Sequence, residues 1–120
     1  MKVVYLAGPI AKNCSSDARK LNIQRGLDAT ERILREGFLV VSPFFLANFV
    51  VGKEINPPSK KEMYDYSMRM VSVCDILVMV GDCSNSIGAS HEIGFAHGRN
   101  IPVFRSVDEF IEAARRQQTS

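Results

Sequence analysis

The stretch ILVMVGDCSNSIGASHEIGFAHGRNIPVF, Ile76 to Phe104, contains two predicted strands separated by one predicted helix. The continuous apolar run over 76–80 favours a strand buried on both faces, and Gly81 follows it directly. After a loop rich in Ser and Asn, a helix is predicted from about Gly88 to Gly98, and a second apolar run over 101–104 predicts another strand. This order, with short connections, predicts two parallel strands joined by a right-handed crossover.

The rest of the chain continues the same alternation of strand and helix. Further strands are predicted at 3–7 and 38–41, and further helices at 15–37, 60–74 and 107–115. A chain of 120 residues, 46% of them hydrophobic, is long enough to bury one core. The sequence therefore predicts one α/β domain over residues 1–120. We expect a Rossmann-like or flavodoxin-like three-layer sandwich with a parallel sheet of four to five strands.

Charge and cysteine content argue against several classes of protein. A formal net charge of +2 without a long basic block is not typical of a protein that binds DNA or RNA. His91 and His97 are six residues apart, on different faces of a helix, so neither a metal site nor a cofactor is predicted. Three cysteines without a CxxC pair, no signal-peptide pattern and no apolar run of membrane-spanning length predict a cytoplasmic protein without membrane contact.

Ligands of parallel α/β sheets bind at the carboxyl ends of the strands, so the loops that follow the strands are the candidate site. These loops cover 8–13, 42–44 and 81–88. If Ser86 caps the following helix, its first backbone N–H groups form a possible anion cradle, and Gly88 allows close approach of a ligand. Phe44 is a candidate for stacking on a base, although burial is the ordinary role of such a residue.

Glu92 lies about a turn and a half into that helix, and the residues alone leave its role open. Most helix glutamates are surface charges, so composition favours a surface carboxylate that interacts with the helix start or pairs with His91 or Arg99. The other reading is a reacting carboxylate. Tyr5 is similarly ambiguous, because a tyrosine in a buried strand usually packs with its hydroxyl satisfied.

Three motifs bear on this choice: YLAGPI at 5–10, CDILVMV at 74–80 and SIGASHEIGFAHGRNIPVF at 86–104. Together, and in this order, they resemble the nucleoside 2-deoxyribosyltransferase-like superfamily, which includes deoxyribosyltransferases and deoxynucleoside 5′-monophosphate N-glycosidases. The resemblance implies that Glu92 is a nucleophile that attacks the anomeric carbon of the sugar. It implies that the Tyr5 hydroxyl orients Glu92, and that Ser86 and Gly88 lie near a 5′-phosphate. It also implies a homodimer or higher homo-oligomer.

Residues of the first and third loops complete the predicted site. Asp82, after the third predicted strand, is the carboxylate that can act as an acid beside Glu92, although a loop-capping role is the more common one for such an aspartate. The predicted substrate-binding residues are Gly8, Pro9, Ile10, Lys12, Ser86, Gly88 and Phe44. The predicted partner is a small-molecule nucleoside or nucleotide.

Two positions depart from the pattern of the superfamily. Its members usually carry an aspartate eight residues before Asp75, where it assists the departing base, and this chain has Ser67 there. The monophosphate hydrolases carry a serine and an arginine in the first loop, where this chain has Pro9 and Ala11, with Lys12 adjacent. A leaving group that is already cationic while bound, such as the nicotinamide of NAD, departs as a neutral molecule and needs no acid, so an NAD-like substrate is one hypothesis.

The sequence thus supports an N-glycosidase or transferase first. The alternative is a nucleotide-binding or sensing module on the same fold with reduced catalysis. A nucleotide phosphoribohydrolase of the lysine-decarboxylase-like type ranks last, because its PGGxGTxxE pattern is absent.

Overall fold

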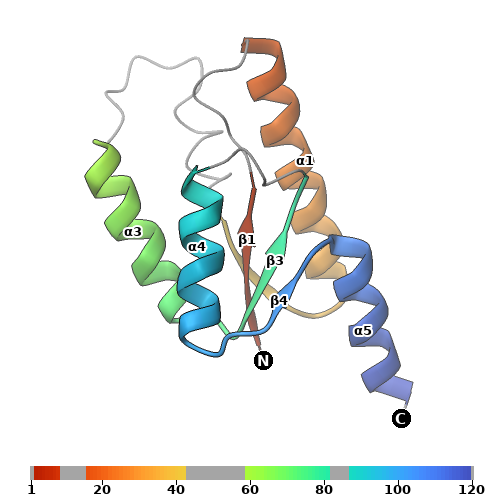
Figure 1. Ribbon diagram of the computed structural model, residues 1–120. Coiled ribbons are helices and arrows are strands. Elements are labelled where there is room, and N and C mark those ends of the chain that lie inside the picture. The colour runs from red at the N-terminus through yellow and green to blue at the C-terminus, as the bar shows by residue number, and fades with distance from the viewer. Residues whose placement is uncertain (1, 9–15, 43–58, 82–86, 120) are drawn as a thin grey trace.

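The computed structural model describes residues 2–8, 16–42, 59–81 and 87–119, which form four strands and four helices (Figure 1). The strands are β1 (Val3–Ala7), β2 (Leu39–Val41), β3 (Ile76–Met79) and β4 (Val103–Phe104). The helices are α1 (Ser16–Arg35), α3 (Lys60–Ser72), α4 (Ile87–Gly98) and α5 (Val107–Thr119). Each of these elements was predicted from the sequence, with ends that differ by a few residues.

All strand pairs are parallel, and the order across the sheet is β2-β1-β3-β4. This is the order of the first four strands of the flavodoxin-like fold, in which the chain moves to one side of β1 first and then to the other. The predicted α/β three-layer sandwich is therefore confirmed, with four strands in the described part of the chain. The switch in direction lies between β1 and β3, the place where ligands bind in such sheets.

Helices cover both faces of the sheet (Figure 1). Helices α1 and α5 pack on one face, where Val4 and Leu6 of β1 belong to one buried cluster with Ile33 and Phe110. Helices α3 and α4 pack on the other face, where a second buried cluster contains Tyr5, Ala7, Leu77, Val71, Cys74 and Ala96. Successive side chains of a strand point to opposite faces, so β1 divides its residues between two separate cores.

Local signals explain where several helices begin and end. Ser59 caps α3 through a capping box: its hydroxyl accepts from the Glu62 N–H at 3.1 Å, and the Glu62 carboxylate accepts from the Ser59 N–H at 3.0 Å. Helix α4 ends in a Schellman arrangement, with the Ile101 N–H donating to the Ala96 carbonyl at 2.9 Å and Asn100 at a φ of 59°. Gly37, at a φ of 92°, follows α1.

The buried stripe of α1 is narrower than its apolar pattern suggests. Leu21, Ile23, Ile33 and Leu34 recur at near-helical spacing in the sequence. Ile23 and Ile33 are buried, whereas Leu21 and Leu34 are about half exposed. On α3 the buried stripe passes through Val71 and includes Cys74 just beyond the helix end, whereas Val73 is 67% exposed. Helix ends and the edges of apolar stripes are the parts that periodicity defines least sharply.

Candidate active site

Glu92 points into the protein. It belongs to the buried stripe of α4, together with Ala89 and Ala96, and only 5% of it is exposed. These residues are separated by three and four positions along the helix, so they share the face that packs on the sheet. The interpretation of Glu92 as a surface charge is therefore wrong, since a carboxyl group occupies a core position.

Tyr5 reaches the same interior from the sheet. It is fully buried in β1, and its side chain lies in the cluster formed between the sheet, α3 and α4. Among the described residues, neither the Tyr5 hydroxyl nor Oε2 of Glu92 has a hydrogen-bond partner of standard geometry. Buried polar groups in this state are rare and costly, and they often mark a functional site. The two groups are nevertheless close enough to affect each other's ionisation.

Burial dominates the electrostatics of this pair. It raises the pKa of Glu92 from the ordinary 4.5 to about 7, and the Tyr5 hydroxyl offsets part of that rise by interacting with the carboxylate. Burial also raises the pKa of Tyr5 far above its usual value, and the Glu92 carboxyl adds to this effect. Tyr5 therefore stays protonated and can donate its proton to the ionised Glu92 carboxylate, whereas Glu92 changes charge near neutral pH.

The basic side chains nearest to Glu92 along α4 are directed elsewhere. The Arg99 guanidinium lies over the Phe95 ring, 4.9 Å from its centroid. His91 packs edge-on against Tyr64 of α3, with ring centroids 5.2 Å apart. Within the described residues, Glu92 thus has no ion-pair partner on its own helix, and the predicted pairing with His91 or Arg99 is not found.

Ser67 is a member of this site whose role the sequence did not reveal. The sequence distinguishes it only by the resemblance, which places an aspartate at this position in the superfamily. It lies half-buried on α3, and its hydroxyl interacts with Tyr5 in the sense that lowers the pKa of the Tyr5 hydroxyl. Ser67 precedes the buried Val71 by four residues, so the two share a helix face. This spacing is the sequence signal that predicts Ser67 on the side of α3 that packs on the sheet.

The structure places some of the other predicted residues. Gly8 follows β1 directly and is buried, and the neighbouring Val80 N–H donates to the Ala7 carbonyl at 2.8 Å, so the ends of β1 and β3 are held together. Gly88 lies exposed in the first turn of α4, and outside its chain neighbours and its own helix backbone no described atom lies within 4 Å of the position a Cβ would take. The predictions for Asp82, Pro9, Ile10, Lys12, Ser86 and Phe44 lie outside the described residues.

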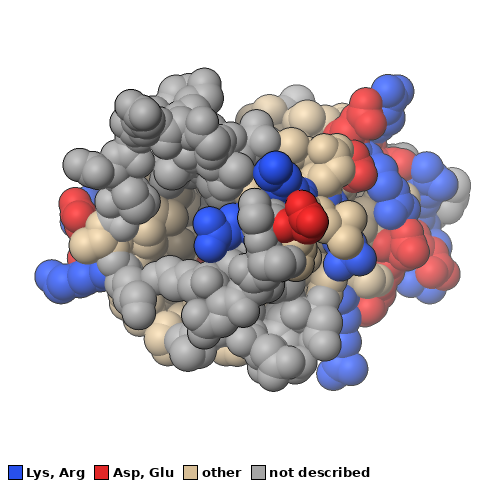
Figure 2. All heavy atoms as spheres, turned by 90° about the horizontal axis from the view of Figure 1, so that it is seen from above, with Lys and Arg blue, Asp and Glu red and all other residues tan. Residues whose placement is uncertain are grey.

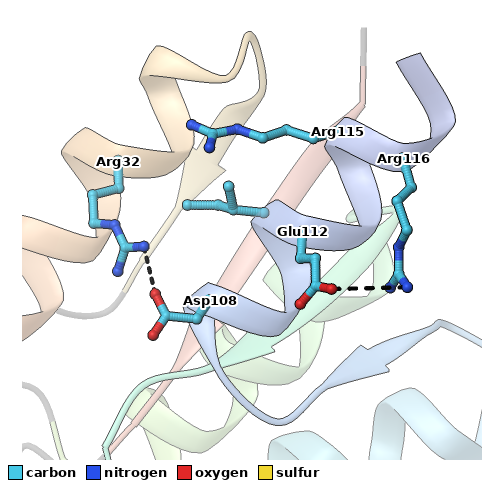
Figure 3. Close-up of a pocket in the computed structure, with 6 residues that line it drawn as sticks. Arg32, Asp108, Glu112, Arg115 and Arg116 are labelled. Carbon is cyan, nitrogen blue, oxygen red and sulfur yellow. Dashed lines mark hydrogen bonds and ion pairs between the residues drawn. The ribbon is translucent and has the colours of Figure 1, made fainter. Parts of the chain in front are cut away.

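A separate groove lies between α1 and α5, on the opposite face of the sheet from Glu92 (Figure 3). Its arginines are already engaged: Arg32 pairs with Asp108 and Arg116 with Glu112. Figure 2 shows acidic and basic side chains intermixed on this side of the molecule. Such a surface offers no excess of either charge for a ligand, so the groove is not the candidate site.

The described regions lack a cluster of metal ligands and a membrane-spanning helix. No group of three or more His, Cys, Asp or Glu side chains there could hold a metal ion. No helix of the described chain is long and apolar enough to span a bilayer.

Comparison with known proteins adds a family. Residues 2–105 match the family described as Domain of unknown function (DUF4406). The chain belongs to the DUF4406 family. That description assigns no activity, and the matched region ends before α5. No curated protein matched this DUF4406 sequence.

One similar solved structure is described as a conserved protein from Enterococcus faecalis V583. The TM-score is 0.65 at 21% sequence identity, over 86% of this chain and 61% of the other. At that identity the similarity shows the fold alone. The chain spans about three fifths of the length of the enterococcal protein.

Proposed function

We propose that this DUF4406 protein cleaves, or transfers a sugar at, the N-glycosidic bond of a nucleoside or nucleoside 5′-monophosphate. The observation that carries the proposal is the buried pair of Glu92 and Tyr5, whose facing polar atoms have no hydrogen-bond partner in the described chain. A core carboxyl group without a cation is costly to keep, and a positively charged sugar transition state supplies the missing partner. The motif resemblance to nucleoside 2-deoxyribosyltransferases supports the same assignment.

The proposed reaction has two steps. The ionised Glu92 carboxylate attacks the anomeric carbon, the C–N bond breaks, and the base leaves with the bonding electrons and takes up a proton. Tyr5 holds the attacking carboxylate by donating its hydroxyl proton. Water then displaces Glu92 from the sugar ester and gives hydrolysis, or a second base displaces it and gives transfer. Asp82 is the predicted source of the proton for the departing base, to be tested with Asp82→Asn.

Two observations favour the alternative, a nucleotide-binding or sensing module with reduced catalysis. The position of the usual acid is Ser67, which is too weak an acid to protonate a base. A pKa of about 7 also leaves roughly half of Glu92 protonated, and so not nucleophilic, at neutral pH. An enzyme that tolerates both features needs a base that leaves readily, so NAD is included among the test substrates.

The experiment incubates the purified protein with nucleosides, their 5′-monophosphates and NAD, with and without a free acceptor base, and separates the products by chromatography. Glu92→Gln removes the nucleophile while keeping the size of the side chain. Glu112→Gln on α5, an exposed carboxylate on the opposite face, is the matched control. Base release that persists in Glu112→Gln and disappears in Glu92→Gln supports the enzyme.

No release from any substrate, together with thermal stabilisation by one of them, supports the binding module. Release that is equal in Glu92→Gln refutes the proposed mechanism. The homo-oligomer implied by the resemblance is tested separately, by light scattering of the same preparation.

A further inference from the structure

The face of α3 that packs on the sheet includes a polar side chain, that of Ser67. Met70 and Val71 of this face, with Cys74 just beyond the helix end, belong to or pack against the cluster that contains Tyr5. Ser67 precedes Met70 by three residues and Val71 by four, so it lies on the same face, one turn closer to the carboxyl edge of the sheet. A hydroxyl group is therefore presented at the place where Tyr5 and Glu92 meet.

The polar surroundings of the Tyr5 hydroxyl come from two helices. Glu92 interacts with it from α4, and Ser67 interacts with it from α3. Neither contact has the geometry of a hydrogen bond, since the Tyr5 hydroxyl has no hydrogen-bond partner among the described residues.

We propose that Ser67 is a positioning residue, which donates its hydroxyl proton to the Tyr5 oxygen and thereby directs the Tyr5 proton onto Oε2 of Glu92. A phenol has one proton to give, and a donor on its oxygen leaves that proton for the carboxylate. Such a chain of hydroxyl groups strengthens the last bond and favours the ionised form of Glu92. The catalytic meaning of this inference rests on the proposed function, whereas the contact can be tested without a substrate.

Other groups facing the pair do not provide the same effect. Tyr66 of α3 acts on Tyr5 only as a weak charge influence and is 39% exposed. Burial raises the pKa of Cys74 to about 11, so this thiol does not titrate in the range of Glu92. The described neighbours from β3 and α4 in this cluster, Leu77 and Ala96, are apolar.

The test measures the pKa of Glu92 by carbon NMR of carboxyl-labelled glutamate in the full-length protein, with the signal assigned by Glu92→Gln. The variants are Ser67→Ala, Tyr5→Phe and the double variant. Ser72→Ala is the matched control, because the Ser72 hydroxyl is on the same helix and donates to the Arg69 carbonyl instead. Ser67→Thr keeps the hydroxyl and is expected to behave as the wild type.

Tyr5→Phe is expected to raise the pKa of Glu92 by about one pH unit, the effect of losing one hydrogen bond to a carboxylate. Ser67→Ala is expected to raise it by about half as much when Tyr5 is present, and not at all in the Tyr5→Phe background. A purely structural role predicts the same effect in both backgrounds. That result, or no shift in either single variant, overturns the proposal.

The activity measurement separates this inference from the proposed function. If the wild type releases a base, Ser67→Ala should lower kcat with little change in KM and move the acidic limb of the pH profile to higher pH. If the wild type is inactive and the NMR coupling is present, the glycosidase proposal fails and the positioning role of Ser67 stands. If base release depends on Glu92 but the NMR coupling is absent, the glycosidase proposal stands and the positioning role of Ser67 fails.

Discussion

The buried carboxyl of Glu92 should make the protein less stable as the pH rises. Its pKa is about 7 in the folded chain and close to the ordinary 4.5 when the chain is unfolded. Between these values the folded state keeps a proton that the unfolded state has released, so the free energy of unfolding falls with increasing pH. Below about pH 4.5 the penalty is absent, and above about pH 7 it is complete.

The magnitude follows from the difference between the two pKa values. A difference of roughly 2.5 pH units, at about 1.4 kcal/mol for each, gives a cost on the order of 3 kcal/mol at alkaline pH. Because only 5% of Glu92 is exposed, solvent screening reduces this cost little. Glu92→Gln removes the charge and keeps the shape, so it should be more stable than the wild type at pH 8.

Urea denaturation at pH 5, 6, 7 and 8 measures the effect, since the difference between variant and wild type isolates Glu92 from other titrating groups. We expect this difference to grow by about 1.4 kcal/mol per pH unit from 5 to 7 and then to level off. Glu112→Gln, on the exposed surface of α5, should change stability little at any pH. A difference for Glu92→Gln that does not vary with pH would refute the assignment of Glu92 as a buried carboxyl with a raised pKa.

Three further predictions concern the site and its supports. Tyr5→Phe should lower base release by about tenfold or more at pH 7, because fewer molecules carry an ionised Glu92 and the orientation of its carboxylate is lost. Steady-state kinetics across pH measures this effect, and an unchanged rate contradicts the role of Tyr5. Gly88→Ala and Gly94→Ala have free space for the added methyl group and should stabilise α4 by up to about 1 kcal/mol. Of these two variants, only Gly88→Ala should weaken ligand binding measured by calorimetry. Equal ligand affinities of the Gly88→Ala and Gly94→Ala variants would show that Gly88 is not part of the site. Ser59→Ala should destabilise the protein by about 1 kcal/mol through loss of the α3 cap, measured by thermal unfolding, and no loss would show that the cap is dispensable.

The sheet and its helices could be predicted from sequence because their signals are local. Continuous apolar runs identified β1 and β3 within one residue, and the predicted ranges of α1 and α3 differ from the observed ones by no more than two residues at either end. The short β4 was predicted two residues too long at its start, because Ile101 and Pro102 are part of the connection that follows α4. The sequence predicted a parallel Rossmann-like or flavodoxin-like sheet but not the order of its strands, since strand pairing depends on contacts between distant segments.

The burial of Glu92 could not be predicted in the same way. Helix α4 has apolar residues around most of its circumference and almost no polar–apolar asymmetry, so its pattern does not identify the face that meets the sheet. Similarly, every residue of β1 is apolar or aromatic, and the sequence does not say that Tyr5 faces α3 and α4. The role of Ser67 could not be predicted either, because it depends on Tyr5 facing α3 and α4 and on Glu92 being buried beside Tyr5.

The division of β1 between two cores has an evolutionary consequence. Val4 and Leu6 face the helices that hold the molecule together on one side, whereas Tyr5 faces the candidate site on the other. Substitutions around Phe110 can therefore raise or lower the lifetime of the folded state while leaving the chemistry of the opposite face untouched. A lineage carrying the destabilising Glu92 can accumulate compensating changes in α1 and α5, so these helices are free to diverge while the functional face stays the same.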